Sequence, residues 1–284
     1  MLEEVSLFAE GKERTTKHNY LNYGKKLEAF LQTKHLDLRT MTPIDVKAFI
    51  YEAGENRDGE FVMNSAAIHK QYVCSLLRAV GRKDVADWVK LNVREIHKED
   101  KFKVDLALEE ILTLIHVTEQ LPLKFGWSLM AFDGLRAGEV LGLFYDDLDT
   151  EQKVIRLLRR EGEPYYPKGM KVSDAAMTIP LNDLSIELFK QLPHKRGERI
   201  LPISYKTLRK WFNRYVAIAG LTARDYPITM QKLRHFFGHF WRWNKGDLRI
   251  LKEVMRHSDI RYTMLYTAPS DAEMKTEFAK VVQI

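Results

Sequence analysis

The amino-acid sequence predicts a mainly helical protein with two domains: a helical N-terminal domain and a mostly helical second domain that contains a small antiparallel β-sheet. Three observations predict this fold class. Apolar residues recur at helical spacing through most of the 284 residues. A charged, apolar-poor segment interrupts them at 93–103. One stretch of the second half has the turn residues and short apolar runs of a β-hairpin.

The N-terminal domain, residues 1–95, is expected to contain four amphipathic helices because its apolar residues recur on one helical face between clear helix start and stop signals. The expected boundaries are Thr15 or Thr16 as the N-cap of the first helix, Thr42-Pro43 and Gly54 around the second, Ser65 and Gly81 around the third, and Lys83 and Leu91 around the fourth. Cys74 lies on the apolar face of the third helix and is expected to be a packed core thiol.

A linker is expected over 96–103, followed by a second domain over 104–284. Its helices are expected at 106–119, 123–143, 182–191, 204–219, 229–243, 247–256, 258–267 and 270–283. The hairpin strands should lie at 154–158 and 176–179, joined by a loop rich in Gly, Pro, Tyr and Lys. Asp146 and Asp147 follow an apolar segment and are expected to be solvated turn residues.

Composition narrows the class of protein. A single cysteine excludes a disulfide framework and a four-cysteine zinc site, and it is typical of a reducing compartment. The sequence has no apolar run of the roughly 20 residues that cross a bilayer, and its first residues lack the order of a signal peptide. We therefore expect a soluble, cytoplasmic protein with no membrane partner.

The positive charge is concentrated in the second domain. The net charge is +6, yet residues 1–100 carry 16 basic and 16 acidic residues. Within 153–261 there are 23 basic and 10 acidic residues, interleaved with aromatic residues. Such a segment is typical of a surface that binds a polyanion such as nucleic acid, although solvated helix faces would give the same count.

Several catalytic motifs are absent, including a phosphate-binding Gly-rich loop, G-x-S-x-G and H-E-x-x-H. His235 and His239 are four residues apart, but no further ligand completes a metal site, so we interpret them as structural imidazoles. The remaining candidates are basic or phenolic. They are Arg136 with Glu139 three residues later, Lys168 and Lys171 in the hairpin loop, Gln231 and Arg234 on one helix face, and His257 nine residues before Tyr266.

These four groups occur in a familiar order: GLRAGE, a hairpin lysine, QKLRHFF, and RHSDIRYTMLY. The order and spacing resemble the catalytic domain of the tyrosine recombinases. This family includes the phage integrases, the archaeal integrases and the Xer-like recombinases. The resemblance covers about 104–267, and the first hundred residues resemble the family's core-binding domain. It implies the tyrosine recombinase fold and a site-specific recombinase or integrase that binds double-stranded DNA at a specific site and assembles as a tetramer on paired sites.

The resemblance also implies roles for the residues. Arg136 and Arg234 would clamp the phosphate, His257 would donate a further hydrogen bond, and Tyr266 would be the nucleophile that forms a 3′-phosphotyrosine. Lys168, or alternatively Lys171, would protonate the leaving 5′-oxygen. Glu139 would brace Arg136. No cofactor or metal is implied, because the strand is rejoined with conserved bond energy.

The sequence departs from the family at Gln231, where many members have His or Lys. An amide can bind a phosphate but cannot hold a proton, so the group that accepts the Tyr266 proton is not identified. Tyr262 competes as nucleophile, but its spacing from His257 is shorter. Two other functions stay open: a type IB topoisomerase-like relaxing enzyme, and a DNA-binding regulator on the same fold that does not cleave. The segment 270–283 is expected to dock either on its own domain or on a neighbouring protomer.

Overall fold

The computed structural model describes residues 2–12, 14–55, 62–90, 106–168, 170–223, 227–257, 259–264 and 266. The chain divides into two compact units, Met1–His97 and Lys98–Ile284, and each has its own hydrophobic core. The expected linker 96–103 and the C-terminal helix 270–283 lie outside the described residues. The roles expected for the two domains, DNA binding for the first and catalysis for the second, stay predictions.

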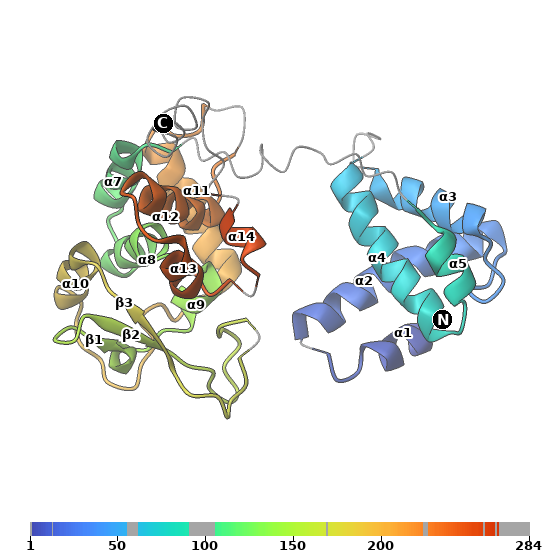
Figure 1. The fold of residues 1–284 in the computed structure, drawn as a ribbon, viewed down its shortest axis with the longest axis horizontal. Helices are drawn as coiled ribbons and strands as arrows, with labels where there is room; N and C mark the ends of the chain where they lie inside the picture. Colours follow the sequence, from blue (N-terminus) through green and yellow to red (C-terminus); the bar gives the residue numbers. More distant parts are fainter. Residues whose placement is uncertain are drawn as a thin grey trace, which may run out of the picture. The chain divides into compact units, whose positions relative to one another are not determined.

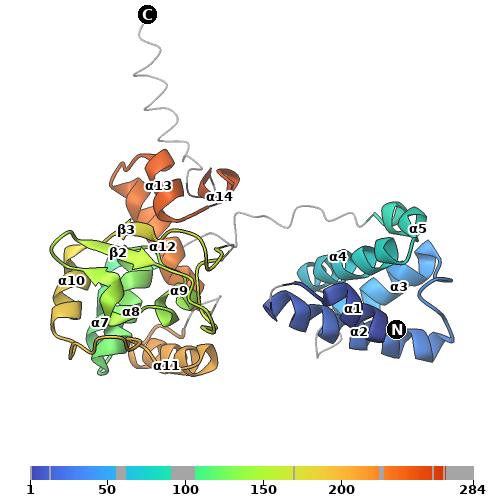
Figure 2. The ribbon, with the colours of Figure 1, turned by 90° about the horizontal axis from the view of Figure 1, so that it is seen from below.

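The first unit is built from helices that surround one core (Figures 1 and 2). The described helices are α1 (Leu2–Ala9), α2 (Arg14–Lys34), α3 (Pro43–Gly54), α4 (Met63–Ala79) and α5 (Lys83–Trp88). Leu27, Phe30, Ile50 and Leu77 are among the buried residues that α2, α3 and α4 bring together. Cys74 is buried, as expected.

Local signals explain the ends of these helices in part. Thr42 and Asp45 form a capping box at α3, because the Thr42 hydroxyl accepts from Asp45 N–H and the Asp45 carboxylate accepts from Thr42 N–H at 2.8 Å. After α4, Gly81 adopts a φ of +84° and lets the chain turn out of the helix. The expected N-caps Thr15 and Thr16 were wrong, since α2 already begins at Arg14. Helix α1 was not predicted.

His69 is a buried polar residue of the first core. Its ring packs edge-on against Tyr23 and Phe49, and its Nδ1 has no hydrogen-bond partner among the described residues. Burial, helped by Lys26, lowers the pKa of His69 to about 4. Below pH ~6.5, His69 binds a proton in the unfolded chain but stays neutral in the folded state. The free energy of unfolding therefore falls as the pH drops from about 6.5 towards 4.

We expect His69→Phe to remove this acid sensitivity. The variant should be more stable than wild type at pH 5, by about 2 kcal/mol, and should lose that advantage at pH 8, where His69 is neutral in both states. Hydrogen exchange of the α3 and α4 amides at the two pH values measures the difference. Equal pH dependence in both proteins would contradict the assignment.

The second unit combines a helical layer with a small sheet. Its described helices are α7 (Leu108–Val117), α8 (Leu121–Phe132), α9 (Ala137–Leu141), η1 (Tyr145–Asp147, a 3-10 turn), α10 (Asp183–Lys190), α11 (Tyr205–Ile218), α12 (Met230–Trp243), α13 (Leu248–Val254) and α14 (Arg261–Met264). Helix α8 is buried along most of its length and packs against α10 and α12. The sheet lies beside α10 (Figure 1).

The sheet contains β1 (Leu148–Asp149), β2 (Val154–Leu157) and β3 (Met177–Pro180), in that order and antiparallel. The register pairs Ile155 with Leu148 and with Ile179. The predicted hairpin is confirmed, whereas β1 was not predicted because two residues carry no strand pattern. Asp147 was wrongly expected to be solvated: it is 3% exposed and accepts hydrogen bonds from Arg160, whose guanidinium compensates its buried charge.

One predicted helix is interrupted, and another lies partly outside the described residues. The helix expected at 123–143 is interrupted, since α8 ends at Phe132 and α9 begins only at Ala137. The helix expected at 258–267 is described only as α14, which packs against α13 (Figure 2). No helix among the described residues is long and apolar enough to span a membrane.

Candidate active site

The break between α8 and α9 places Arg136 at the start of a new helix. Gly134 has a φ of +66°, and a Cβ there would lie 2.6 Å from the Phe237 ring, so both backbone conformation and space require glycine. The preceding Asp133 is anchored by Asn182 and Ser185, whose side chains each donate to it at 2.6 Å. Arg136 then becomes the N-cap residue of α9.

Asp133 is a buried carboxyl that holds this turn against α10. Burial raises the pKa of Asp133 to about 7, although the hydrogen bonds from Ser185 and Asn182 oppose the shift. The hydrogen bonds from Asn182 and Ser185 to Asp133 fix the turn against the start of α10. This network positions the segment that carries the first candidate arginine.

Glu139 stands at the centre of an arginine cluster. Its carboxylate accepts from Arg136 Nη1 at 3.0 Å and from the Arg136 backbone N–H at 2.7 Å. Arg256 donates to both of its oxygens, and Arg234 Nη1 lies 3.9 Å away. Burial alone would raise the pKa of Glu139, but the arginines, Arg256 foremost, hold it below its usual value. Glu139 therefore stays charged and orients cations that would otherwise repel one another.

We expect Glu139→Gln to destabilise the second unit by about 3–5 kcal/mol, because the guanidinium groups around it lose the carboxylate that they share. The matched control is Glu187→Gln, which removes an exposed ion pair with Lys190 and should cost at most about 1 kcal/mol. Denaturant unfolding of both variants gives the comparison. Similar losses in the two variants would show that the cluster does not depend on Glu139.

Arg234 is carried by α12 and is 1% exposed. Its two terminal nitrogens donate to the carbonyls of Gly134 and Met255, which belong to the α8–α9 turn and the end of α13. Burial, with Arg136 nearby, lowers the pKa of Arg234 to about 9, so the guanidinium is still charged at neutral pH. The side chain thus joins three segments that are distant in the sequence.

Arg256 and His257 follow α13 directly. Arg256 adopts a φ of +53°, an uncommon conformation for a residue with a side chain, and this turns its guanidinium onto Glu139. His257 Nδ1 lies 2.9 Å from the Thr263 hydroxyl. Burial, followed by Arg234 and Arg136, lowers the pKa of His257 to about 4. Its ring stacks on Tyr266 with centroids 6.2 Å apart.

Tyr266 lies in the same cluster and is 2% exposed. Its hydroxyl is 2.9 Å from His235 Nδ1, and the edge of His239 contacts its ring. A Cβ at Gly238 would come within 2.7 Å of the ring, so only glycine leaves room for it on α12. Burial raises the pKa of Tyr266 to about 12, while Arg234 and Arg136 oppose the shift. Tyr262, the alternative nucleophile, is 55% exposed.

The other predicted site residues lie at the surface. Lys168 and Lys171 are exposed in the loop between β2 and β3. Gln231 is exposed at the start of α12, in a groove with Tyr205 and Arg209. Among the described residues, the hydrogen-bond partner of the Tyr266 hydroxyl is therefore His235 and not Gln231. The structure brings together Arg136, Glu139, Arg234, His257 and Tyr266.

Two residues of the cluster were missed from the sequence. Arg256 directly precedes His257, but nothing in the sequence pairs it with Glu139. His235 follows Arg234 directly and lies one helical turn after Gln231. This spacing places His235 on the same helix face as Gln231 and could have marked it as a site residue. No group of three or more metal-ligating side chains occurs within the part of the chain that the structure describes.

Comparisons with known proteins find relatives in sequence and in fold. The chain is 28% identical over 154 residues to "Tyrosine recombinase XerC" of Listeria innocua, an alignment that covers 52% of this chain and 49% of the relative. The chain thus spans about half the length of the curated relatives it matches.

Solved structures share the fold. The Tn1549 transposon integrase in complex with transposon right end DNA superposes with a TM-score of 0.68 at 17% identity, covering 99% of this chain and 98% of the other. The XerH site-specific recombinase bound to difH substrate gives a TM-score of 0.67 at 17% identity, covering 97% and 82%. The sequence profile of the phage integrase family matches residues 105–273, which contain every residue of the cluster described above. The chain belongs to the phage integrase family.

Proposed function

We propose that this protein is a site-specific DNA recombinase that cleaves and rejoins DNA strands through a 3′-phosphotyrosine intermediate. One observation carries the proposal: a buried tyrosine hydroxyl lies in one cluster with Arg136, Arg234 and His257, which come from separate segments of the fold. Family membership and the shared fold support it.

The chemistry follows from these side chains. Arg136 and Arg234 present guanidinium groups that match the two non-bridging oxygens of a phosphodiester and stabilise its developing charge. His257 adds a hydrogen bond to the same phosphate. Tyr266 attacks phosphorus, the 5′-oxygen leaves, and the bond energy is kept in the phosphotyrosine. Lys168, with Lys171 as the alternative, protonates the leaving oxygen from the loop between β2 and β3.

Access to the cluster is through Arg136. Its side chain is 32% exposed, whereas Glu139 and Arg234 are almost fully covered. The scissile phosphate therefore enters on the Arg136 side. Tyr266 is 2% exposed, so its hydroxyl must become accessible before it reaches phosphorus.

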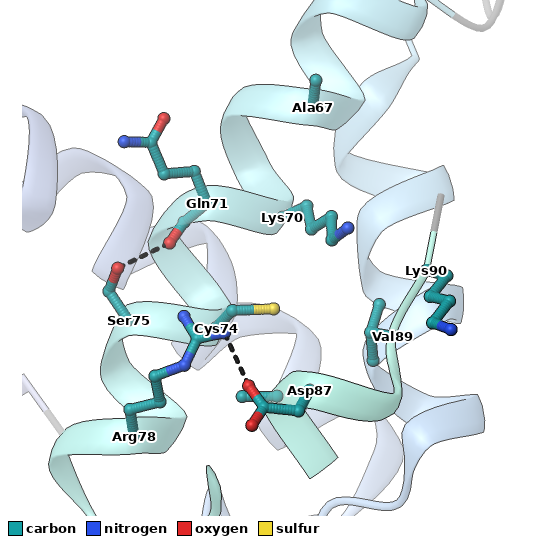
Figure 3. Close-up of a pocket in the computed structure, with 10 residues that line it drawn as sticks. Ala67, Lys70, Gln71, Cys74, Ser75, Arg78, Asp87, Val89 and Lys90 are labelled. Atoms are coloured by element: carbon teal, nitrogen blue, oxygen red, sulfur yellow. Dashed lines mark hydrogen bonds and ion pairs between the residues drawn. The ribbon is translucent and has the colours of Figure 1, made fainter. Parts of the chain in front are cut away.

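Double-stranded DNA with a specific recombination site is the proposed partner. In the second unit, Lys206, Arg209 and Lys210 line a groove on α11, within the strongly basic segment. In the first unit, Lys70 and Lys90 line a groove between α4 and α5, while Arg78 is tied to Asp87 at 2.9 Å (Figure 3). These surfaces supply phosphate contacts without reading bases.

We expect the lysines that line these grooves to contribute to the salt dependence of DNA binding. Lys206→Gln and Lys210→Gln should each reduce the slope of log affinity against log salt by about 0.9, whatever the DNA sequence. Lys190→Gln, on α10 and paired with Glu187, is the control and should leave the slope unchanged. Filter binding at several salt concentrations measures this. Unchanged slopes in both α11 variants would contradict DNA binding by α11.

The experiment that tests the function uses a supercoiled plasmid carrying the DNA that flanks the encoding gene. We expect a covalent protein–DNA adduct, trapped by detergent, that forms in EDTA and maps to one sequence. Relaxation of any plasmid without a preferred site would favour the topoisomerase reading. DNA binding with no adduct on any DNA would favour the regulator. Loss of the adduct on chelation would contradict cleavage by arginines alone.

Assembly as a tetramer on paired sites is part of the proposal. The segment 270–284, outside the described residues, carries an apolar stripe that includes Phe278 and is too short to be stable alone. Phe278→Asp should leave binding to a single site intact and reduce cooperative binding to paired sites, as gel shifts can measure. Unchanged cooperativity with a lower melting temperature would show that the segment packs on its own domain.

A further inference from the structure

The tyrosine hydroxyl already has a hydrogen-bond partner that the roles assigned above do not use. His235 Nδ1 lies 2.9 Å from the Tyr266 oxygen, and the two rings are 6.0 Å apart at their centroids. His235 directly follows Arg234 and lies four residues after Gln231, so all three project from one side of α12. The imidazole therefore stands next to the arginine that binds the phosphate.

The protonation state of His235 suits a proton acceptor. Burial, followed by Arg234, His239 and Lys232, lowers the pKa of His235 to about 4, so the ring is neutral at physiological pH. Tyr266 keeps its proton, because burial raises its pKa to about 12. A neutral imidazole with its hydrogen on Nε2 accepts through Nδ1, and the phenol is then the donor.

We propose that His235, in place of Gln231, accepts the proton of Tyr266 during strand cleavage. The Oη–H bond breaks as an Nδ1–H bond forms. The Oη–P bond forms as the P–O5′ bond breaks, and the 5′-oxygen takes a proton from the hairpin lysine. Rejoining returns each proton by the reverse path. This inference rests on the proposed function and identifies the base for it.

The neighbouring charges couple this transfer to DNA binding. A proton on His235 is opposed first by burial of the ring and then by Arg234 beside it. A phosphodiester bound to Arg136 and Arg234 brings negative charge to the same place and offsets that repulsion. Proton transfer from Tyr266 to His235 therefore costs less free energy when the scissile phosphate is in position than when it is not.

The test measures single-turnover adduct formation on a nicked substrate built around the mapped cleavage site. His235→Phe removes the acceptor, and His235→Gln keeps a hydrogen-bonding amide without basicity. We expect both to slow adduct formation by roughly 10²–10⁴-fold, while DNA affinity stays near that of wild type. Gln231→Leu is the comparator and should be slowed much less.

Two substitutions of the reacting groups separate a proton acceptor from a merely structural contact. Difluorotyrosine at position 266 is more acidic and should reduce the deficit of His235→Gln by at least about tenfold, because a weaker base suffices. A 5′-thio leaving group, which needs no protonation, should rescue Lys168→Ala but not His235→Gln. The second readout holds even if His235→Phe does not fold.

Cleavage by His235→Gln at or above the wild-type rate would show that the hydrogen bond between His235 and Tyr266 only holds the tyrosine in place before cleavage. That result would overturn the proposal. A deficit that difluorotyrosine leaves unchanged, or that the 5′-thio group removes, would overturn it as well. Failure of wild type to form any adduct overturns the proposed function, and the proton acceptor with it.

Discussion

Tyr266→Phe should abolish the covalent protein–DNA adduct and leave DNA affinity within about twofold of wild type, because one hydroxyl adds little to binding that depends on many phosphate contacts. The ring keeps its packing against Gly238 and His257, so the fold is preserved. A nicked substrate that traps the cleaved strand measures adduct, and a gel shift measures affinity.

Tyr262→Phe is the matched control. Tyr262 is 55% exposed and lies one helical turn before Tyr266, yet its hydroxyl has no assigned part in the cluster. This variant should form the adduct at close to the wild-type rate. Loss of the adduct in Tyr262→Phe and its retention in Tyr266→Phe would show that the nucleophile is misassigned.

Arg234→Lys should reduce the cleavage rate by about 10³-fold, although the charge is conserved. A guanidinium can donate to Gly134 and Met255 and still face the phosphate, whereas a lysine ammonium is a point charge without that fork. The buried site should also lose stability, since two carbonyls lose their donor. Single-turnover cleavage and thermal unfolding measure the two effects.

The control for this change is Arg249→Lys. Arg249 lies on the neighbouring α13, is exposed, and pairs with the exposed Asp247, so neither cleavage nor stability should change. An Arg234→Lys variant that cleaves within about tenfold of wild type would contradict the bidentate clamp, because the loss of one preorganised donor alone is expected to cost more.

The sequence was most informative where structure depends on local signals. Thr42-Pro43, the hairpin strands and the amphipathic α12 were all readable from spacing and turn residues. Gly134 was visible as a break, but the predicted helix ran through it. The reason for the break is the Phe237 ring, more than one hundred residues later, which leaves no space for a Cβ.

The candidate site also depends on contacts between residues that are distant in the sequence, which local patterns do not predict. Its arginines, histidine and tyrosine were found by their order along the chain. Arg256 was not, because it reaches Glu139 across 117 residues and through an unusual backbone angle. His235 was interpreted as a structural imidazole, because no further ligand in the sequence completes a metal site with His239. The His235 contact joins α12 to Tyr266, 31 residues later in the chain, and no local pattern in the sequence indicates it.

Identification of the residue that carries the DNA tests the central claim most directly. Trypsin should release residues 262–275 as one peptide, which contains both Tyr262 and Tyr266. After nuclease digestion of the trapped adduct, fragmentation of this peptide in a mass spectrometer locates the attached nucleotide. We predict a 3′-phosphoryl link to Tyr266. A nucleotide on Tyr262, or on any residue outside this peptide, would contradict the account.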